Sequence, residues 1–188
     1  MADRGVETEL KIPVEDLSEV RTTLVGRGAK MVTESMREVN LLLDTEDREL
    51  SGRGCVLRLR RYGTRHILTF KGPTSYDGSI KIRTEHELEI DDIEKMKLVL
   101  GALGFSPCAR YEKDRESWRL DDVEVVLDHT PMGDFVEVEG PAESLGAAAE
   151  SLGLEPSSAV RGSYMSLWAD YRAGDSGRDL PADMVFDE

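Results

Sequence analysis

The stretch Val6-Glu7-Thr8-Glu9-Leu10-Lys11-Ile12, near the start of a chain of 188 residues, alternates with the period of two that is typical of a β-strand. Glu7, Glu9 and Lys11 share one face of this strand, and the apolar side chains share the other. A strand with one solvated face would carry the same triplet. Its meaning therefore depends on whether later strands repeat the arrangement.

The arrangement returns near the other end of the chain. Phe135-Val136-Glu137-Val138-Glu139 again places two carboxylates on one face and valines on the other. Residues 123–128 alternate in the same way and end in Asp128. The sequence therefore predicts acidic strand faces at both ends of one domain.

The strands expected between these ends carry basic side chains on the corresponding face. Seven such residues follow from the alternation: Arg58, Arg60, Lys71, Lys81, Arg83, Lys113 and Arg115. Guanidinium and ammonium groups of this kind suit phosphate oxygens. The carboxylates of Glu7, Glu9, Asp128, Glu137 and Glu139 are hard oxygen ligands suited to Mg²⁺ or Mn²⁺. Glu85 and Glu87 fit either a metal or an ion pair with the basic residues.

Alternation and helical spacing together predict an antiparallel α+β domain over residues 1–172. Strands are expected at 6–12, 30–44, 55–61, 65–71, 79–90, 108–119, 123–128 and 135–139, and helices at 14–27, 93–103, 142–152 and 158–172. Residues 45–54 are expected to be a polar loop. Residues 173–188 are acidic and poor in apolar side chains, so a loosely held tail is predicted there.

Each predicted strand has one apolar face, and each predicted helix has one apolar stripe. The helices are therefore expected to cover the apolar side of the sheet, with the charged faces together on the far side. An open sheet would leave these charges in water, whereas a closed barrel of about eight strands would enclose them. Because burying unpaired charge costs several kcal/mol per ion, such a barrel would need a charged ligand.

Composition excludes several classes of protein. With 38 acidic and 24 basic residues the formal net charge is −14, which argues against non-specific binding to nucleic acid or an anionic membrane. Cys55 and Cys108 have no metal-binding or redox spacing and are expected to be reduced thiols. Neither an apolar signal segment nor a bilayer-spanning apolar run is present, which predicts a cytoplasmic protein.

The segment Glu7-x-Glu9-x-Lys11 resembles the Glu-x-Glu-x-Lys signature of the CYTH family, the triphosphate tunnel metalloenzymes named for class IV adenylyl cyclase and thiamine triphosphatase. The resemblance continues in the family's order through Leu57-Arg58-Leu59-Arg60, Thr69-Phe70-Lys71, Lys81-Ile82-Arg83, Lys113-Asp114-Arg115, Val126-Leu127-Asp128 and Phe135-Val136-Glu137-Val138-Glu139. It covers about residues 5–172 and is strongest to class IV adenylyl cyclase-like members. Membership implies an eight-stranded antiparallel barrel, a tunnel that binds a triphosphate with its metal ions.

The resemblance also implies roles for individual residues. Glu7, Glu9, Asp128, Glu137 and Glu139 would bind one or two Mg²⁺ or Mn²⁺ ions, and the seven basic residues above would hold the phosphates. Lys11 would contact a phosphate or position the nucleophile, so that it forms the catalytic group with Glu7 and Glu9.

Three functions remain open at this point. In a cyclase the 3′-hydroxyl of ATP attacks the α-phosphorus and pyrophosphate leaves. In a triphosphatase water attacks the terminal phosphorus of inorganic triphosphate or of an organic triphosphate such as a nucleotide. A non-catalytic triphosphate-binding module is the third, although it would need fewer carboxylates. The cyclase-like resemblance also implies a homodimer.

Overall fold

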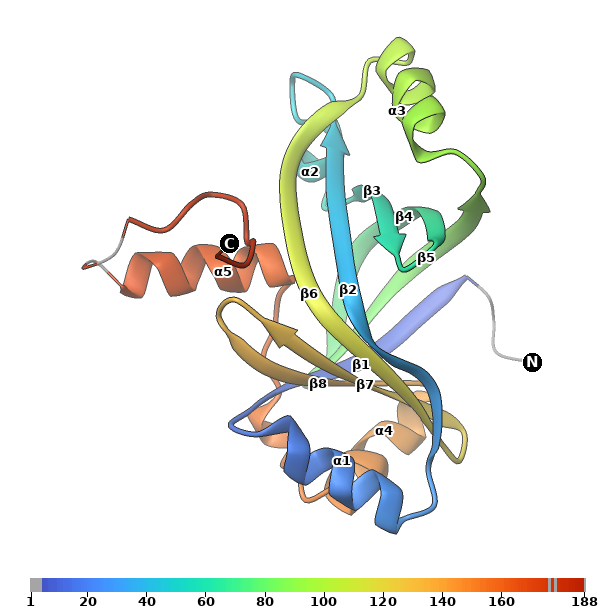
Figure 1. The fold of residues 1–188 in the computed structure, drawn as a ribbon. Coiled ribbons are helices and arrows are strands. Elements are labelled where there is room, and N and C mark those ends of the chain that lie inside the picture. The colour runs from blue at the N-terminus through green and yellow to red at the C-terminus, as the bar shows by residue number, and fades with distance from the viewer. Residues whose placement is uncertain (1–4, 176, 178, 188) are drawn as a thin grey trace.

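The computed structural model describes residues 5–175, 177 and 179–187, and its strands form a closed antiparallel barrel (Figure 1). The strands are β1 (Val6–Val14), β2 (Lys30–Asp44), β3 (Val56–Tyr62), β4 (Arg65–Asp77), β5 (Ile80–Ile90), β6 (Ser106–Leu120), β7 (Val123–Thr130) and β8 (Gly133–Glu139). Around the barrel they follow the order β1-β5-β4-β3-β2-β6-β7-β8. The prediction of an eight-stranded antiparallel barrel with external helices is confirmed.

The helices cover the outside of the barrel at separate places. They are α1 (Leu17–Gly26), α2 (Glu49–Gly52), α3 (Ile93–Ala102), α4 (Ala142–Ser151), the 3₁₀ turn η1 (Pro156–Ser158) and α5 (Tyr164–Gly174). Figure 1 shows α1 and α4 together beneath β7 and β8, with α3 at the opposite end. Among the described residues, no helix has both the length and the apolar character needed to span a bilayer.

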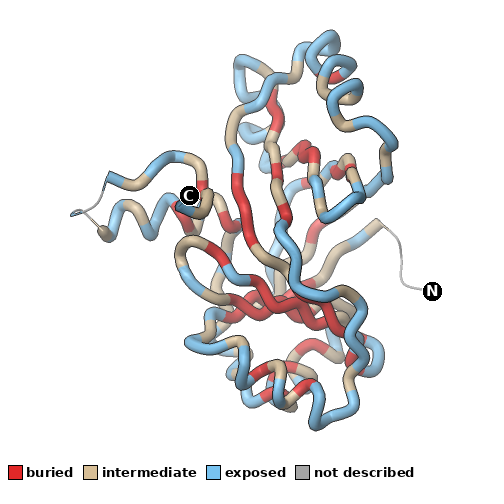
Figure 2. The backbone as a smooth tube through the Cα atoms, viewed as in Figure 1, coloured by how far each residue is buried: buried red, intermediate tan, exposed pale blue. Residues whose placement is uncertain are grey.

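The main apolar core lies between α1, α4 and the outer faces of β1, β7 and β8. Leu24 of α1 and Leu145 of α4 meet Val125 of β7 and Val136 and Val138 of β8, and all five are fully buried. These valines alternate with the acidic residues seen in the sequence, so burial on one face turns the carboxylates to the other. Figure 2 shows many buried residues along β7 and β8, whereas the residues of α3 are mostly exposed.

The structure differs from the sequence predictions at several element boundaries, and the strand expected at 65–71 extends to Asp77. The first strand continues through Pro13, and α1 begins only after Asp16, whose side chain accepts a hydrogen bond from Ser18 N. The last helix starts at Tyr164 rather than near 158, because Ser163 and Ser166 form a capping box that fixes its first turn. The expected loop at 45–54 contains the single turn α2.

The described part of the C-terminal segment contacts β6 and α5. Met184 is fully buried, its carbonyl accepts from Glu112 N (2.7 Å), and its amide donates to Arg110 O (3.1 Å). Trp168 Nε1 donates to Pro181 O (3.0 Å). Arg178 and Glu188 lie outside the described residues, and the division into a domain and a loosely held tail stays a prediction.

The substitution Met184→Ala tests whether this segment is held in solution. Removing a fully buried methionine side chain is expected to cost about 2–5 kcal/mol of unfolding free energy, measured by denaturant titration. Leu98→Ala on α3, where the leucine is 75% exposed, should change the same quantity by less than about 0.5 kcal/mol. Equal stability of Met184→Ala and the unchanged protein would mean that the segment is loosely held.

Candidate functional site

The inner faces of the barrel strands bring the predicted site residues together. Residues directly opposite each other in antiparallel strands share a face, and the register pairs Glu9 with Lys81, Lys11 with Glu137 and Arg115 with Asp128. Each of these pairs joins a predicted cation to a predicted carboxylate. The charged faces therefore line the interior of a closed barrel. The sequence had left both a closed barrel and an open sheet possible.

A cluster of three carboxylates lies where β1 meets β8. Oxygen atoms of Glu7, Glu9 and Glu139 all lie within 4.8 Å of one another, and Glu9 stands directly opposite Glu139 across the two strands. Like charges in such a cross-strand position are destabilising. Lys71 compensates Glu7 at 2.9 Å, and Lys81 compensates Glu9 at 2.7 Å. Within the described residues Glu139 has no ion pair, so the cluster retains room for a further positive charge.

Glu139 has the most unusual protonation of this cluster. Burial, followed by the charges of Glu7 and Glu137, raises its pKa from 4.5 to about 8. At neutral pH the carboxyl group therefore keeps its proton unless a cation takes its place. Three carboxylates with hard oxygen atoms at this spacing fit a divalent ion such as Mg²⁺ or Mn²⁺.

Asp128 and Glu137, also predicted as metal ligands, lie instead among cations. Asp128 Oδ2 is 2.9 Å from Lys113 Nζ and accepts a hydrogen bond from the Tyr164 hydroxyl (2.6 Å). Glu137 contacts both Lys11 and Arg115. Burial alone would raise the pKa of Glu137, but these two cations hold it well below its usual value. The structure thus separates the five predicted ligands into a cluster of three and an ion-paired group of two.

Lys11 lies between the two carboxylate groups. Its Nζ contacts Glu137, is 3.8 Å from Glu9 and lies 4.0 Å from the centre of the Tyr164 ring. Burial alone would lower the pKa of Lys11, but the charges of Glu137 and Glu9 raise it above its normal value. Lys11 therefore remains an ammonium ion throughout the neutral pH range.

The basic residues of β3, β4 and β5 are held by different partners. Arg58 donates to the Tyr111 hydroxyl (3.0 Å) and to Thr69 (3.2 Å). Glu85 and Glu87, for which the sequence allowed two roles, lie 3.6 and 3.3 Å from the Arg58 guanidinium as ion-pair partners.

Arg83 has a backbone partner. Its guanidinium donates twice to the Gly72 carbonyl, at 2.6 and 3.1 Å, where the register of β4 against β5 is irregular between Lys71 and Thr74. The irregularity turns a carbonyl group towards this guanidinium, and Arg83 forms no ion pair with any of the described carboxylates.

Glu38, Asn40, Tyr111 and Tyr164 also have polar groups in the interior and were not predicted as site residues from the sequence. Glu38 and Asn40 of β2 alternate with apolar residues, and this parity was the signal that could have found them. Tyr111 and Tyr164 gave no local signal, because their hydroxyl groups reach Arg58 and Asp128 only through long-range packing.

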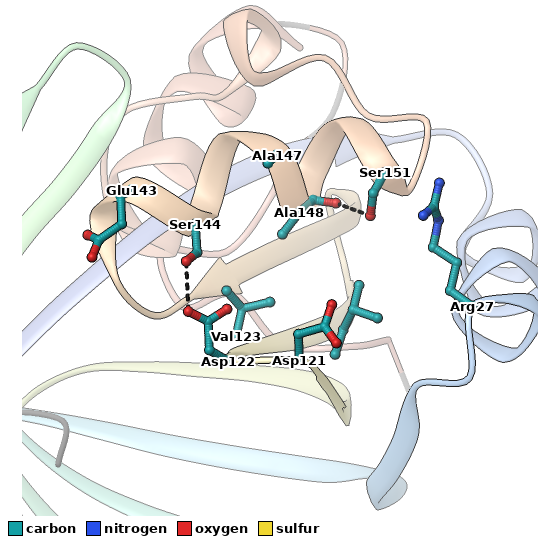
Figure 3. A pocket seen from close by; sticks show the side chains of 10 residues that line it. Arg27, Asp121, Asp122, Val123, Glu143, Ser144, Ala147, Ala148 and Ser151 are labelled. Carbon is teal, nitrogen blue, oxygen red and sulfur yellow. Dashed lines mark hydrogen bonds between the residues drawn. The ribbon is translucent and has the colours of Figure 1, made fainter.

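The outer surface contains a separate hollow of about 370 Å³ between α4 and the turn joining β6 to β7 (Figure 3). Ser144 Oγ donates to Asp122 Oδ2 (2.7 Å), and Ser151 Oγ donates to Ala148 O (2.8 Å). Its hydroxyl groups are thus paired within the protein, and nothing in the hollow indicates a ligand.

Comparison with known proteins gives a consistent result. The model of the CYTH domain matches residues 5–164. A protein from Methanocaldococcus jannaschii named "Putative adenylate cyclase MJ0240" is 27% identical over an alignment of 173 residues, and the match covers 86% of this chain and 98% of the relative.

Two solved structures illustrate the similarity in fold. One is described as a "putative adenylate cyclase" from Vibrio parahaemolyticus, with 20% identity, a TM-score of 0.79 and coverage of 87% of this chain and 97% of the other. The second is described as a "putative adenylyl cyclase" from Hippeastrum with a dominant triphosphatase activity. Its identity is 18%, its TM-score 0.66, and the coverage 96% of this chain and 99% of the other.

The raised pKa of Glu139 predicts a pH dependence of metal binding. The carboxyl group of Glu139 ionises near pH 4.5 in the unfolded chain but only near pH 8 in the folded protein. Its contribution to the free energy of unfolding is therefore fully present below about pH 4.5 and is lost as the pH rises towards about 8. A cation must displace the proton, so the Kd for Mn²⁺ should fall by up to about tenfold per pH unit between about pH 6 and 8. Calorimetric titrations measure this slope, and Glu139→Gln should lose it. A Kd independent of pH in the unchanged protein would contradict the assignment.

Proposed function

The chain belongs to the CYTH family, and on this premise we propose that it is a divalent-metal-dependent enzyme acting on a triphosphate inside the barrel. The favoured reaction is that of a class IV adenylyl cyclase, which converts ATP to cyclic AMP and pyrophosphate. One observation carries the proposal. A cluster of three carboxylates lies next to a set of buried arginines and lysines within a closed barrel.

Glu7, Glu9 and Glu139 would hold Mg²⁺ or Mn²⁺, because their oxygen atoms lie close together and Glu139 lacks a compensating cation among the described residues. The bound ion would supply charge neutralisation for the phosphate oxygens and the leaving group. Asp128 and Glu137 would act differently from the sequence prediction, by holding Lys113, Arg115 and Lys11 in place.

The charges of the interior nearly balance one another before any ligand binds, because only Glu139, which keeps its proton at neutral pH, leaves one cation in excess. Among the described residues, eight basic ones face it: Lys11, Arg58, Arg60, Lys71, Lys81, Arg83, Lys113 and Arg115. Eight acidic residues oppose them: Glu7, Glu9, Glu38, Glu85, Glu87, Asp128, Glu137 and Glu139. A triphosphate alone would add unbalanced negative charge, so the metal and the triphosphate are expected to bind together.

The basic residues would hold the phosphates in line for displacement. Arg58, Arg60 and Arg115 provide guanidinium forks, and the lysines provide point charges. Because Lys11 keeps its proton at neutral pH, it would stabilise charge on a phosphate or orient the nucleophile and would not serve as a general base.

In the cyclase reaction a bond forms between the 3′-oxygen of ATP and the α-phosphorus. The bond from that phosphorus to the bridging oxygen breaks, pyrophosphate leaves with the electron pair, and the hydroxyl proton is released. Buried cations positioned around the phosphates would favour the charge that develops on the leaving group.

The second candidate is a triphosphatase, in which water attacks the terminal phosphorus. The triphosphatase activity described for the Hippeastrum protein, which shares this fold, favours it. A non-catalytic binding module is disfavoured, since three clustered carboxylates exceed what phosphate binding needs. The cytoplasmic location and the homodimer implied by the resemblance stay predictions.

A single assay separates these functions. The purified protein is incubated with Mn²⁺ or Mg²⁺ and either ATP or inorganic triphosphate, and the products are analysed. Cyclic AMP with pyrophosphate would identify a cyclase, and orthophosphate would identify a triphosphatase. Binding without any product would leave the non-catalytic module.

The substitution Glu9→Gln tests the site itself. This change removes the negative charge of one proposed metal ligand and should lower activity at least about hundredfold. The fold should be kept, which circular dichroism checks. Glu89→Gln makes the same change at an exposed ion pair with Arg65 and should leave activity unchanged. Full activity in Glu9→Gln would rule out the proposed metal site.

A further inference from the structure

Two polar residues of β2 face the barrel interior on the side away from the cluster of three carboxylates. Glu38 and Asn40 share one strand face, and both are fully buried. In the strand order β2 lies four positions from β1 in either direction, so these residues stand across the interior from Glu7 and Glu9.

Glu38 lies at the centre of the basic residues. Its carboxylate is 3.5 Å from Arg60 Nε, 3.7 Å from Lys113 Nζ and 4.0 Å from Arg115 Nε. Asn40 Nδ2 donates a hydrogen bond to Glu38 Oε1 (2.9 Å). Burial alone would raise the pKa of Glu38, but Arg60 and Lys113 lower it, so the group is an anion at neutral pH.

Several polar atoms here lack a hydrogen-bond partner among the described residues. Glu38 Oε2 and Asn40 Oδ1 accept no hydrogen bond, and Nε of Arg58 and of Arg60 donate none, although Arg60 Nε forms an ion pair with Glu38 Oε1 at 3.5 Å. A buried polar atom without a partner costs about 1–3 kcal/mol, so four in one region need an explanation.

A phosphate group can satisfy only half of this set. Its oxygen atoms accept hydrogen bonds and would provide acceptors for Nε of Arg58 and of Arg60. The two acceptors, on Glu38 and Asn40, need a donor instead, and an ionised inorganic triphosphate has none. A nucleoside triphosphate has donors in its ribose hydroxyls and in the amino group of adenine.

We infer that Glu38 and Asn40 form a hydrogen-bond-accepting subsite for a hydroxyl or amino group of a nucleoside triphosphate. The inference rests on the proposed function and names the substrate class of that site. The charge of the carboxylate acts on the triphosphate of both ligands, so the subsite distinguishes the two substrates by hydrogen bonding.

The substitution Glu38→Gln gives opposite results for the two substrates. Asn40 Nδ2 keeps the amide oxygen as its acceptor, so the new amide NH₂ falls where Oε2 was and offers a donor instead of an acceptor. The affinity for ATP should fall about tenfold to a hundredfold, the usual effect of losing a hydrogen bond to a charged group. The affinity for inorganic triphosphate should stay the same or increase, because a buried negative charge has been removed.

Affinities are measured as KM for a substrate that is turned over and as an inhibition constant for one that is not. Equal weakening of both ligands in Glu38→Gln would mean that Glu38 only holds Arg60, Lys113 and Arg115 in place, and it would overturn the inference. Asn40→Ala removes the second acceptor without changing charge. It should weaken ATP alone, and an unchanged affinity for ATP would also overturn the inference.

Glu87→Gln is the matched control. Glu87 shares the contact with Arg60, at 3.9 Å, and lies 3.3 Å from Arg58, but its Oε1 already accepts from Thr69 (3.0 Å). The same chemical change at Glu87 should therefore alter ATP and inorganic triphosphate in the same direction. Thermal unfolding of each variant, compared with the unchanged protein, checks that it is folded.

Nucleotide analogues identify which group the subsite accepts. If it is a ribose hydroxyl, 2′-deoxy-ATP or 3′-deoxy-ATP should bind less tightly than ATP, and Glu38→Gln should remove that difference. If it is the adenine amino group, inosine triphosphate should show this behaviour instead. If all analogues bind like ATP, the inference fails. Failure of the proposed function looks different, because the unchanged protein would then bind neither ATP nor inorganic triphosphate with Mn²⁺.

Discussion

Charge pairing inside a closed barrel is the constraint on which this structure depends. An ion removed from water costs several kcal/mol unless an opposite charge compensates it. Lys11 is therefore matched by Glu137 and Arg115 by Asp128 across the strands, whereas Glu9 stands opposite a carboxyl group, that of Glu139. The valines on the outer faces of β7 and β8 complete the arrangement, because α1 and α4 bury them and fix which way the charges point.

Much of this arrangement could be predicted from the sequence, because alternation is a local signal. The period of two in β1, β5 and β8 identified the strands, their charged faces and the residues that meet inside. Alternation alone did not decide between an open sheet and a barrel, since closure depends on β1 pairing with both β5 and β8. The resemblance to a known family supplied that step.

The division of the carboxylates could not be predicted for a related reason. Parity places a residue on a face but does not give its height along the barrel, which the register between strands determines. The register sets Glu9 opposite Glu139, while Asp128 lies opposite Arg115 on β6. The contacts of Met184 could not be predicted from the sequence either. Composition indicates how readily a segment folds alone, but it does not indicate whether the segment pairs with a strand that is distant in the sequence.

Tyr164 joins the inside of the barrel to its C-terminal helix. Its ring packs against Phe135 and beneath Lys11, its hydroxyl binds Asp128, and it is the first residue of α5. The match to the family model ends at this same residue. A fragment that ends at residue 164 would keep the charged groups of the interior that are described above. It would lose the rest of α5, the helix that holds the Tyr164 ring against Phe135 and Lys11. The folded unit that holds the charged interior therefore extends beyond residue 164.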